Sequence, residues 1–220
     1  NNLGIKLAMK EGAKYVLLLN NDTVSEKNAI SILVKKIQEY SADVACPKIL
    51  NYYNRKKINY AGGDIVAYKG GVRIDGIGQV DNGVFNQYRN ITFAHGCCML
   101  IDTDTIVDVG LMADDYFLYF EDTDYSARLI NKGKKIIYCP DAVVYHKESV
   151  STNKYSDNYQ FYFCRNRMLF IKRHISLPVK NIAYLYSIMY MIKHLIKGDF
   201  KLHNVIEALK AFFSNKVGKR

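Results

Sequence analysis

A strand–helix–strand succession near the start of the chain constrains the fold most. Residues 15–19 are apolar at every position, which is typical of a central parallel strand covered on both faces. Ser25 is a suitable N-cap for the amphipathic helix that follows, in which Ala29, Leu33 and Ile37 share one face. Residues 44–46 then open a second strand. This order predicts an open α/β sheet.

The segment after the first predicted strand, residues 20–23, carries amide and carboxylate side chains. Ligands of open α/β sheets bind beyond the carboxyl ends of the strands, so Asn20 and Asp22 lie where a binding site is expected. One carboxylate and one amide oxygen suit a divalent cation such as Mn²⁺ or Mg²⁺, whose remaining ligands are phosphate and water. The alternative is an ordinary Asn/Asp turn after a strand, and the motif alone does not separate the two.

The rest of the chain also divides into predicted strands and helices. A helix before the first strand stops near Gly12, and residues 51–95, rich in Gly and Tyr, predict an irregular meander with antiparallel hairpins. A strand at 98–101 is followed by a helix that ends at Gly133, and by strands at 135–138 and 142–145. From about Tyr159 the chain is predicted to be mainly helical, with a break at Pro178.

Three acidic side chains, Glu121, Asp122 and Asp124, directly follow the aromatic run 116–120. Like charges this close repel one another, and their burial is costly unless a metal ion, a cation or a proton compensates. Acids at a helix start also cap free N–H groups and complement the helix dipole. For three acids beside an aromatic segment we favour an acid–base or metal site, which is compatible with a helix start.

His146 and Arg165 are two further candidates for chemistry. His146 ends the last predicted strand, and neutral imidazole suits Mn²⁺ or Zn²⁺, although a lone histidine is more often structural. Its place after Asp22 and the acidic helix start favours a functional role. Arg165 lies in an aromatic-rich helical segment, where a guanidinium could hold a diphosphate or belong to a basic helix face. The residues alone leave both alternatives open for Arg165.

The net charge of +10 is unevenly distributed along the chain. Residues 1–146 balance 17 Lys and Arg against 17 Asp and Glu, whereas residues 147–220 hold 14 against 4. The apolar stretch 182–196 is shorter than the roughly 20 residues that a bilayer span needs. Followed by lysines, it predicts an interfacial helix on an anionic membrane surface, with packing on the domain as the alternative. We expect no nucleic-acid partner, because no recognised reader motif is present.

The five cysteines are scattered and form no C-x-x-C pair. An odd, scattered set of this kind indicates buried thiols in a reducing compartment. We therefore expect a cytoplasmic protein, and the basic tail adds peripheral association with the inner face of the cell membrane.

Taken in order, the motifs resemble those of the inverting family 2 glycosyltransferases, in particular the rhamnosyltransferase-like branch that builds bacterial surface polysaccharides. The matching segments are Asn2-x-Gly4, residues 12–22, residues 96–100, Phe117-x-Tyr119-x-Glu121-Asp122-x-Asp124 with Arg128, residues 140–146, and Tyr162-x-x-Arg165-Asn166-Arg167. The resemblance runs from residue 1 to about residue 175. It implies an α/β, GT-A-like fold with a mixed, mainly parallel sheet flanked by helices. It also implies a catalytic domain over residues 1–175 and a basic amphipathic helical tail over 176–220.

The activity that the resemblance implies is transfer of a sugar, with rhamnose as one candidate. The donor would be a nucleotide-diphosphate sugar, and the acceptor a saccharide or a lipid-linked molecule. Asp122 matches the general base that deprotonates the acceptor hydroxyl, with Glu121 and Asp124 as its neighbours. Inversion by direct displacement needs such a base, and it needs stabilisation of the departing diphosphate.

On the donor side, Asp22 matches the metal-binding acid of the family, whereas Asn20 stands where many members have aspartate. His146 matches a position that ligates the metal in some members. Gly96 and Arg165 complete the expected donor-binding residues. The implied cofactor is a divalent metal, Mn²⁺ or Mg²⁺.

The resemblance also implies that strands of the nucleotide pocket precede residue 1, about 60 residues in two strand–helix units. We therefore expect an N-terminally truncated domain, weak or no activity of the isolated chain, and an unpaired sheet edge or exposed apolar surface. Two other function classes stay open. One is a metal-dependent phosphohydrolase, which would use the same acids, histidine and arginine. The other is a non-catalytic membrane-surface protein.

Overall fold

The computed structural model describes residues 1–147 and 155–220. The chain forms two compact units, each discontinuous in sequence. The sheet unit comprises Asn1–Asp64, Arg73–Met112 and Tyr125–Ser149. The helical unit comprises Ile65–Val72, Ala113–Asp124 and Val150–Arg220. The division into a catalytic domain over residues 1–175 and a helical tail over 176–220 stays a prediction.

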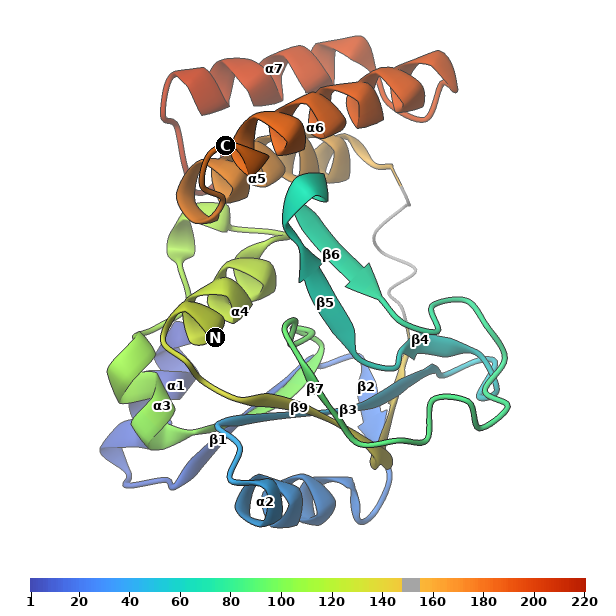
Figure 1. Cartoon of the computed structure of the whole chain (residues 1–220), viewed down its shortest axis with the longest axis vertical. Coiled ribbons are helices and arrows are strands. Elements are labelled where there is room, and N and C mark those ends of the chain that lie inside the picture. The colour runs from blue at the N-terminus through green and yellow to red at the C-terminus, as the bar shows by residue number, and fades with distance from the viewer. Residues whose placement is uncertain (148–154) are drawn as a thin grey trace. The chain divides into compact units, whose positions relative to one another are not determined.

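The sheet unit contains a seven-stranded mixed sheet in the order β1-β8-β3-β9-β2, with β4 paired to β3 and β7 paired to β9 (Figure 1). The strands are β1 Tyr15–Leu19, β2 Thr23–Ser25, β3 Val44–Asn51, β4 Ile58–Tyr60, β7 Arg89–Ile91, β8 Cys98–Asp102 and β9 Ile136–His146. The predicted mixed sheet flanked by helices is confirmed. The predicted proportion of parallel pairs is wrong, because β3 with β9 is the parallel pair of this sheet, and its other pairs in the described residues are antiparallel.

The long strand β3 is buried continuously from Val44 to Leu50. β1 was predicted to be such a central strand, but it lies at the end of the strand order and pairs antiparallel with β8. Val16 and Leu18 are buried, whereas Leu19 is 42% exposed. An apolar run reports hydrophobicity but not the number of neighbouring strands, which explains the error. In the described sheet β1 has β8 as its neighbour, and the side chains of Leu3 and Leu7 are exposed.

Helix α2, Ala29–Tyr40, covers one face of the sheet below β3 and β9 (Figure 1). Its buried residues Ala29, Leu33 and Ile37 recur every four positions, as predicted, and pack in a core with residues of β3, β8 and β9. The N-cap is Asn28 and not Ser25, which ends β2. Helix α1, Asn2–Lys10, precedes β1, and α3, Thr103–Val109, is capped by the Asp102 side chain.

β9 is one strand of 11 residues, where the sequence predicted two strands. Its pairing with β3 shifts register between Pro47 and Lys48, so residues 140–142 form the interruption that the sequence pattern showed as a break. The predicted meander over 51–95 is confirmed by short elements. Besides β4 and β7 these are β5 Gly63–Val66, η1 Ala67–Lys69 and β6 Gly71–Ile74, of which β5 and β6 form a two-stranded sheet.

The helical unit is built from α5 Asp157–His174, α6 Val179–Ile196 and α7 Leu202–Phe213, with η2 Asp114–Tyr116. α5 packs against both α6 and α7, and its Phe161 and Cys164 share a core with Met191 of α6 and Val205 of α7. Helix α4, Glu121–Asn131, begins in this unit and continues in the sheet unit. No helix in the described residues is long and apolar enough to cross a membrane.

Candidate active site

A strand-end cluster in the sheet unit brings together four predicted residues, Asn20, Asp22, Gly96 and His146. The backbone N–H of Asn20, directly after β1, donates to the carbonyl of Cys97 (2.9 Å), which follows Gly96 and directly precedes β8. Thr23 of β2 pairs with His146 at the end of β9, and Lys147 N–H donates to the Asp22 carbonyl (2.9 Å). Strand pairing therefore places Asp22 beside His146.

The Asp22 carboxylate is the candidate cation ligand of this cluster. His146 Nε2 lies 3.2 Å from Asp22 Oδ1. The ring is at ion-pair distance without hydrogen-bond alignment, and within the described part of the chain this buried oxygen has no hydrogen-bond donor. A buried carboxylate oxygen without a donor is costly unless a cation or proton completes it.

These donors fit a divalent cation with an incomplete protein shell. A carboxylate oxygen and an imidazole nitrogen suit Mn²⁺, and Mg²⁺ accepts the carboxylate. Burial, and then the charge of Asp22, raise the pKa of the Cys97 thiol to about 12, so this thiol stays neutral and is a poor metal ligand. The described residues contain no group of three or more His, Cys, Asp or Glu side chains able to hold a metal ion. A cation here would take further ligands from a phosphate or from water.

The acidic cluster in the helical unit consists of Glu121, Asp122 and Asp124 in the first turn of α4. Asp122 Oδ1 accepts hydrogen bonds from the Thr123 N–H (2.7 Å) and the Thr123 hydroxyl (3.3 Å). Asp124 is 2% exposed and accepts from the Tyr116 hydroxyl (3.1 Å), and His174 Nε2 lies 2.7 Å from the same oxygen. Asp124 is therefore held by two side chains, which favours a positioning role for it over chemistry on a substrate.

The Glu121 carboxyl has a raised pKa. Burial, and then the charge of Asp122, raise its pKa to about 7. Its buried Oε2 has no hydrogen-bond partner among the described residues. A carboxyl that takes up a proton near neutral pH is suited to proton transfer, and such groups concentrate at functional sites.

The aromatic turn, residues 116–120, directly precedes this cluster and has an unusual backbone conformation. Phe117, Tyr119 and Phe120 have φ of 59°, 63° and 73°, in the left-handed region that bulky L-residues rarely adopt. Such conformations cost on the order of 1–3 kcal/mol each and persist only where the surroundings impose them. The turn therefore needs an external support.

Asn166 and Arg165 of α5 supply that support. The Asn166 amide Nδ2 lies 2.9, 2.7 and 2.8 Å from the carbonyl oxygens of Tyr116, Leu118 and Tyr119. Arg165 donates to the Asp115 and Tyr116 carbonyls (3.2 and 3.1 Å) and, through Nε, to the Asn166 side-chain oxygen (2.9 Å). It also donates to the Gly218 carbonyl and is 2% exposed. These contacts favour a structural role for Arg165, not the predicted contact with diphosphate.

Sequence reasoning did not find Tyr116, Asn166 or His174 as partners of the acidic cluster. Asn166 was part of a matching motif, but nothing in its spacing indicates that its amide binds carbonyls 47 or more positions away in the chain. His174 lies at the end of α5, two turns beyond that motif, and carries no sequence signal of its own.

The comparison with known families bears on both clusters. The family described as "Glycosyltransferase like family 2" matches residues 3–161, which is most of the chain. The chain belongs to glycosyltransferase-like family 2. The match includes Asn20, Asp22 and His146 of the strand-end cluster and the whole acidic cluster.

Two relatives of this family 2 chain have informative names. It is 26% identical to the low-salt glycan biosynthesis hexosyltransferase Agl10 of Haloferax volcanii over 187 residues, which is 84% of this chain and 59% of that protein. It is 33% identical to the N-acetylglucosaminyl-diphospho-decaprenol L-rhamnosyltransferase of Mycobacterium tuberculosis over 66 residues, or 30% of this chain and 22% of that enzyme. The chain thus spans less than two thirds of either relative.

Two solved glycosyltransferase structures have a fold similar to that of this chain. The mannosyltransferase PcManGT from Pyrobaculum calidifontis, in complex with GDP-Man and Mn²⁺, aligns with a TM-score of 0.51 over 97% of this chain and 55% of that one, at 11% identity. GalNAc-T7 with UDP, GalNAc and Mn²⁺ aligns with a TM-score of 0.50 over 88% of this chain and 44% of that one, at 12% identity. At these identities the likeness shows the fold, and the predicted GT-A-like architecture is confirmed.

Proposed function

We propose that this family 2 chain is the catalytic part of an inverting glycosyltransferase, which moves a hexosyl group from a nucleotide-diphosphate sugar to an acceptor hydroxyl. The observation that carries the proposal is the acidic cluster at the start of α4, fixed by the clamp of Asn166 and Arg165 on the aromatic turn. A carboxyl of raised pKa, here that of Glu121, on an imposed backbone is typical of a catalytic centre.

In the proposed reaction Asp122 removes the proton of the acceptor hydroxyl as that oxygen attacks the anomeric carbon. The bond from this carbon to the diphosphate oxygen breaks on the opposite face, and the nucleoside diphosphate departs with the electron pair. The configuration at the anomeric carbon therefore inverts. Protonation of Glu121, whose pKa is about 7, keeps a second negative charge away from Asp122 at neutral and lower pH. Asp124, held by Tyr116 and His174, fixes the first turn of α4.

The strand-end cluster is the proposed donor side. Asp22 and His146 would hold a divalent cation, which supplies positive charge for the leaving diphosphate when it is bound. The buried, donor-free oxygen of Asp22 supports this assignment. The backbone at Asn20 and Gly96 would line the same donor pocket, next to the paired ends of β1 and β8. The PcManGT and GalNAc-T7 structures each contain Mn²⁺ with a nucleotide, which supports a divalent cation for this chain.

The finer identity of the substrates is also proposed. We take rhamnose as the first donor sugar to test and a lipid-linked saccharide as the first acceptor, because of the likeness to the N-acetylglucosaminyl-diphospho-decaprenol L-rhamnosyltransferase. A lipid-linked acceptor would place the protein at the inner face of the cell membrane, where nucleotide sugars are available.

A donor panel tests the proposal. The chain is incubated with Mn²⁺, a lipid-diphosphate saccharide and dTDP-, UDP- or GDP-linked sugars, and the release of nucleoside diphosphate is measured. Asp122→Asn should lower the rate about a hundredfold or more, because a general base is lost. Asp104→Asn, an exposed aspartate in the first turn of α3, removes the same charge elsewhere and should leave the rate unchanged. Equal rates for Asp122→Asn and the wild type would contradict Asp122 as the base, and retention in the product anomer would contradict inversion.

A further inference from the structure

An apolar stripe runs along the exposed side of α6. Its four members lie at the three- and four-residue steps of a single helix face: Leu185, Met189, Ile192 and Ile196. Their exposed fractions are 60, 62, 49 and 82%, respectively. The opposite side of α6 is already packed, since Ala183, Ser187 and Met191 are buried. The stripe is therefore apolar surface that the described residues of the helical unit leave uncovered.

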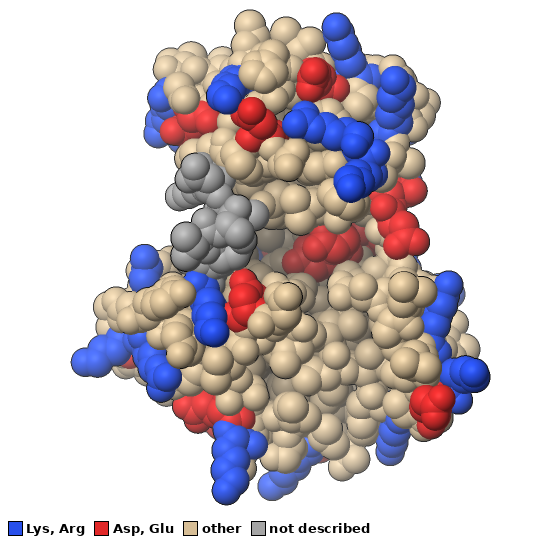
Figure 2. All heavy atoms as spheres, turned by 180° about the vertical axis from the view of Figure 1, so that it is seen from behind, with Lys and Arg blue, Asp and Glu red and all other residues tan. Residues whose placement is uncertain are grey.

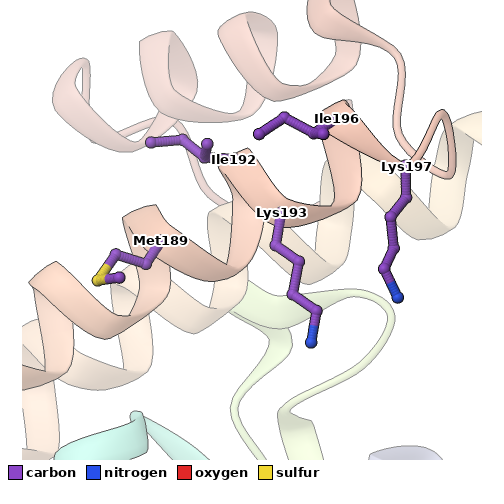
Figure 3. Close-up of a pocket in the computed structure, with 5 residues that line it drawn as sticks. All are labelled: Met189, Ile192, Lys193, Ile196 and Lys197. Atoms are coloured by element: carbon purple, nitrogen blue, oxygen red, sulfur yellow. The ribbon is translucent and has the colours of Figure 1, made fainter.

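Two lysines flank the stripe on one side. Lys193 and Lys197 are one helical turn apart and point the same way, beside Ile192 and Ile196 (Figure 3). With Met189 these residues line a shallow hollow of about 390 Å³. The sequence of α6 contains no Asp or Glu, so the helix presents only positive charge beside the apolar stripe.

Helix α7 repeats the same pattern. Leu202, Ile206 and Phe213 are 62, 41 and 74% exposed, and they follow the same steps around the helix. The buried face of α7 packs on α5 through Val205 and Ala208. Lys and Arg side chains are visible over the C-terminal helices in Figure 2, with acidic side chains among them. Exposed apolar side chains and basic side chains thus occur together on two neighbouring helices of one unit.

We infer that the α6 stripe docks on an anionic phospholipid surface. The apolar side chains would enter the boundary between headgroups and acyl chains, while Lys193 and Lys197 reach the lipid phosphates. Charge complementarity selects this partner, because Lys193 and Lys197 flank the stripe and α6 contains no Asp or Glu. A second copy of the chain would bring the same lysines together along the shared seam, where like charges oppose association. The inference goes beyond the proposed transfer reaction and does not depend on it.

Vesicle co-sedimentation without any sugar donor tests the inference. The wild-type chain is mixed with vesicles of phosphatidylcholine alone, or with about one third phosphatidylglycerol, since anionic lipid supplies the expected attraction. We expect binding to the mixed vesicles that weakens with salt. The double change Leu185→Ser with Ile192→Ser should lower the partition coefficient at least about tenfold, and Lys193→Gln with Lys197→Gln about fivefold per lysine. Both pairs are exposed, so the fold should be unaffected.

Matched controls separate this surface from general attraction. Lys6→Gln with Lys10→Gln removes the same charge at the same helical spacing in α1, and Val107→Ser removes an exposed apolar side chain from α3. Both controls should keep wild-type binding. Equal losses in the two lysine pairs, or unchanged binding of the Leu185 and Ile192 variant, would overturn the inference. The oligomeric state is measured by light scattering. If the wild type is a dimer and Leu185→Ser with Ile192→Ser is a monomer, the stripe binds a second copy of the chain and the inference is overturned.

Discussion

Replacing Asn166 by alanine tests how the acidic cluster is positioned. The Asn166 amide lies within 2.7–2.9 Å of three carbonyl oxygens in the aromatic turn, which leads directly into Glu121 and Asp122. Asn166 is fully buried, so water cannot replace the lost donor without entering the packed unit. The variant therefore removes the Asn166 part of that support and leaves both acids in place.

The magnitude follows from what opposes and what holds the turn. A buried carbonyl left without a donor costs about 1–3 kcal/mol, and the lost amide serves the Leu118 and Tyr119 carbonyls, whereas the Tyr116 carbonyl still accepts from Arg165. The left-handed backbone at Phe117, Tyr119 and Phe120 adds strain of about 1–3 kcal/mol per residue, which favours rearrangement once the clamp is gone. We expect the turn to relax locally, which limits the loss in free energy of unfolding to about 2–4 kcal/mol.

Hydrogen exchange of individual segments is the primary assay. In Asn166→Ala the amides of 117–124 should exchange faster while those of β3 and β9 are unchanged, because local opening precedes global unfolding. Urea unfolding gives the stability. If the proposed transfer reaction is measurable, kcat should fall about tenfold to a hundredfold from misplacement of the base, with the donor KM unchanged. Asn158→Ala, an exposed asparagine on the same helix, is the matched control.

Two results would refute this reasoning. Exchange in 117–124 that matches the wild type, with a stability change below about 0.5 kcal/mol, would show that the amide does not hold the turn. Faster exchange spread evenly over α5, α6 and α7 would show that Asn166 supports helix packing instead.

Three further predictions follow from the two clusters. Because Glu121 has a pKa of about 7 in the folded chain against 4.5 ordinarily, the folded state holds its proton where the unfolded chain has lost it, and stability should fall by up to about 3 kcal/mol as pH rises from 4.5 to 7. Urea unfolding of Glu121→Gln should lack this decline, and a parallel decline in the variant would contradict it. Asp22→Asn should weaken Mn²⁺-dependent binding of a nucleoside diphosphate at least about tenfold by calorimetry, whereas binding without metal should change little. Arg165→Lys, which keeps the charge but loses the planar fork, should lower the free energy of unfolding by about 1–3 kcal/mol, and an unchanged midpoint in urea would contradict the structural role.

The sequence was sufficient for the local elements and for the strand-end cluster. The four-residue spacing of Ala29, Leu33 and Ile37 predicted α2 and the face it buries, since helical periodicity depends only on neighbours along the chain. Asp22 and His146 could be placed at strand ends because each follows an apolar run. Their contact across β2 and β9 then needs only the sheet to form.

Strand neighbours could not be predicted in the same way. The apolar run of β1 and the run that opens β3 are equally hydrophobic in sequence, yet β3 has β8 and β9 on its two sides and β1 has β8 alone in the described sheet. Burial on both faces is a property of the assembled sheet and not of one segment. The excess of antiparallel pairs is likewise set by pairings between distant segments, such as β1 with β8.

The acidic cluster shows why residue type and proximity do not assign roles within a site. The three acids, Glu121, Asp122 and Asp124, are close in sequence, but their carboxylates have different partners in the structure. Asp124 accepts from Tyr116 and lies beside His174, so its position is fixed. Glu121 has a buried oxygen without a partner, so its pKa rises. The two partners of Asp124 come from different elements: Tyr116 lies in η2, and His174 lies at the far end of α5, 50 residues away along the chain. No spacing rule links His174 to the three acids. The different environments of the three acids are therefore a consequence of tertiary packing. The Asn166 amide holds the turn that precedes them, so its removal should disturb all three at once.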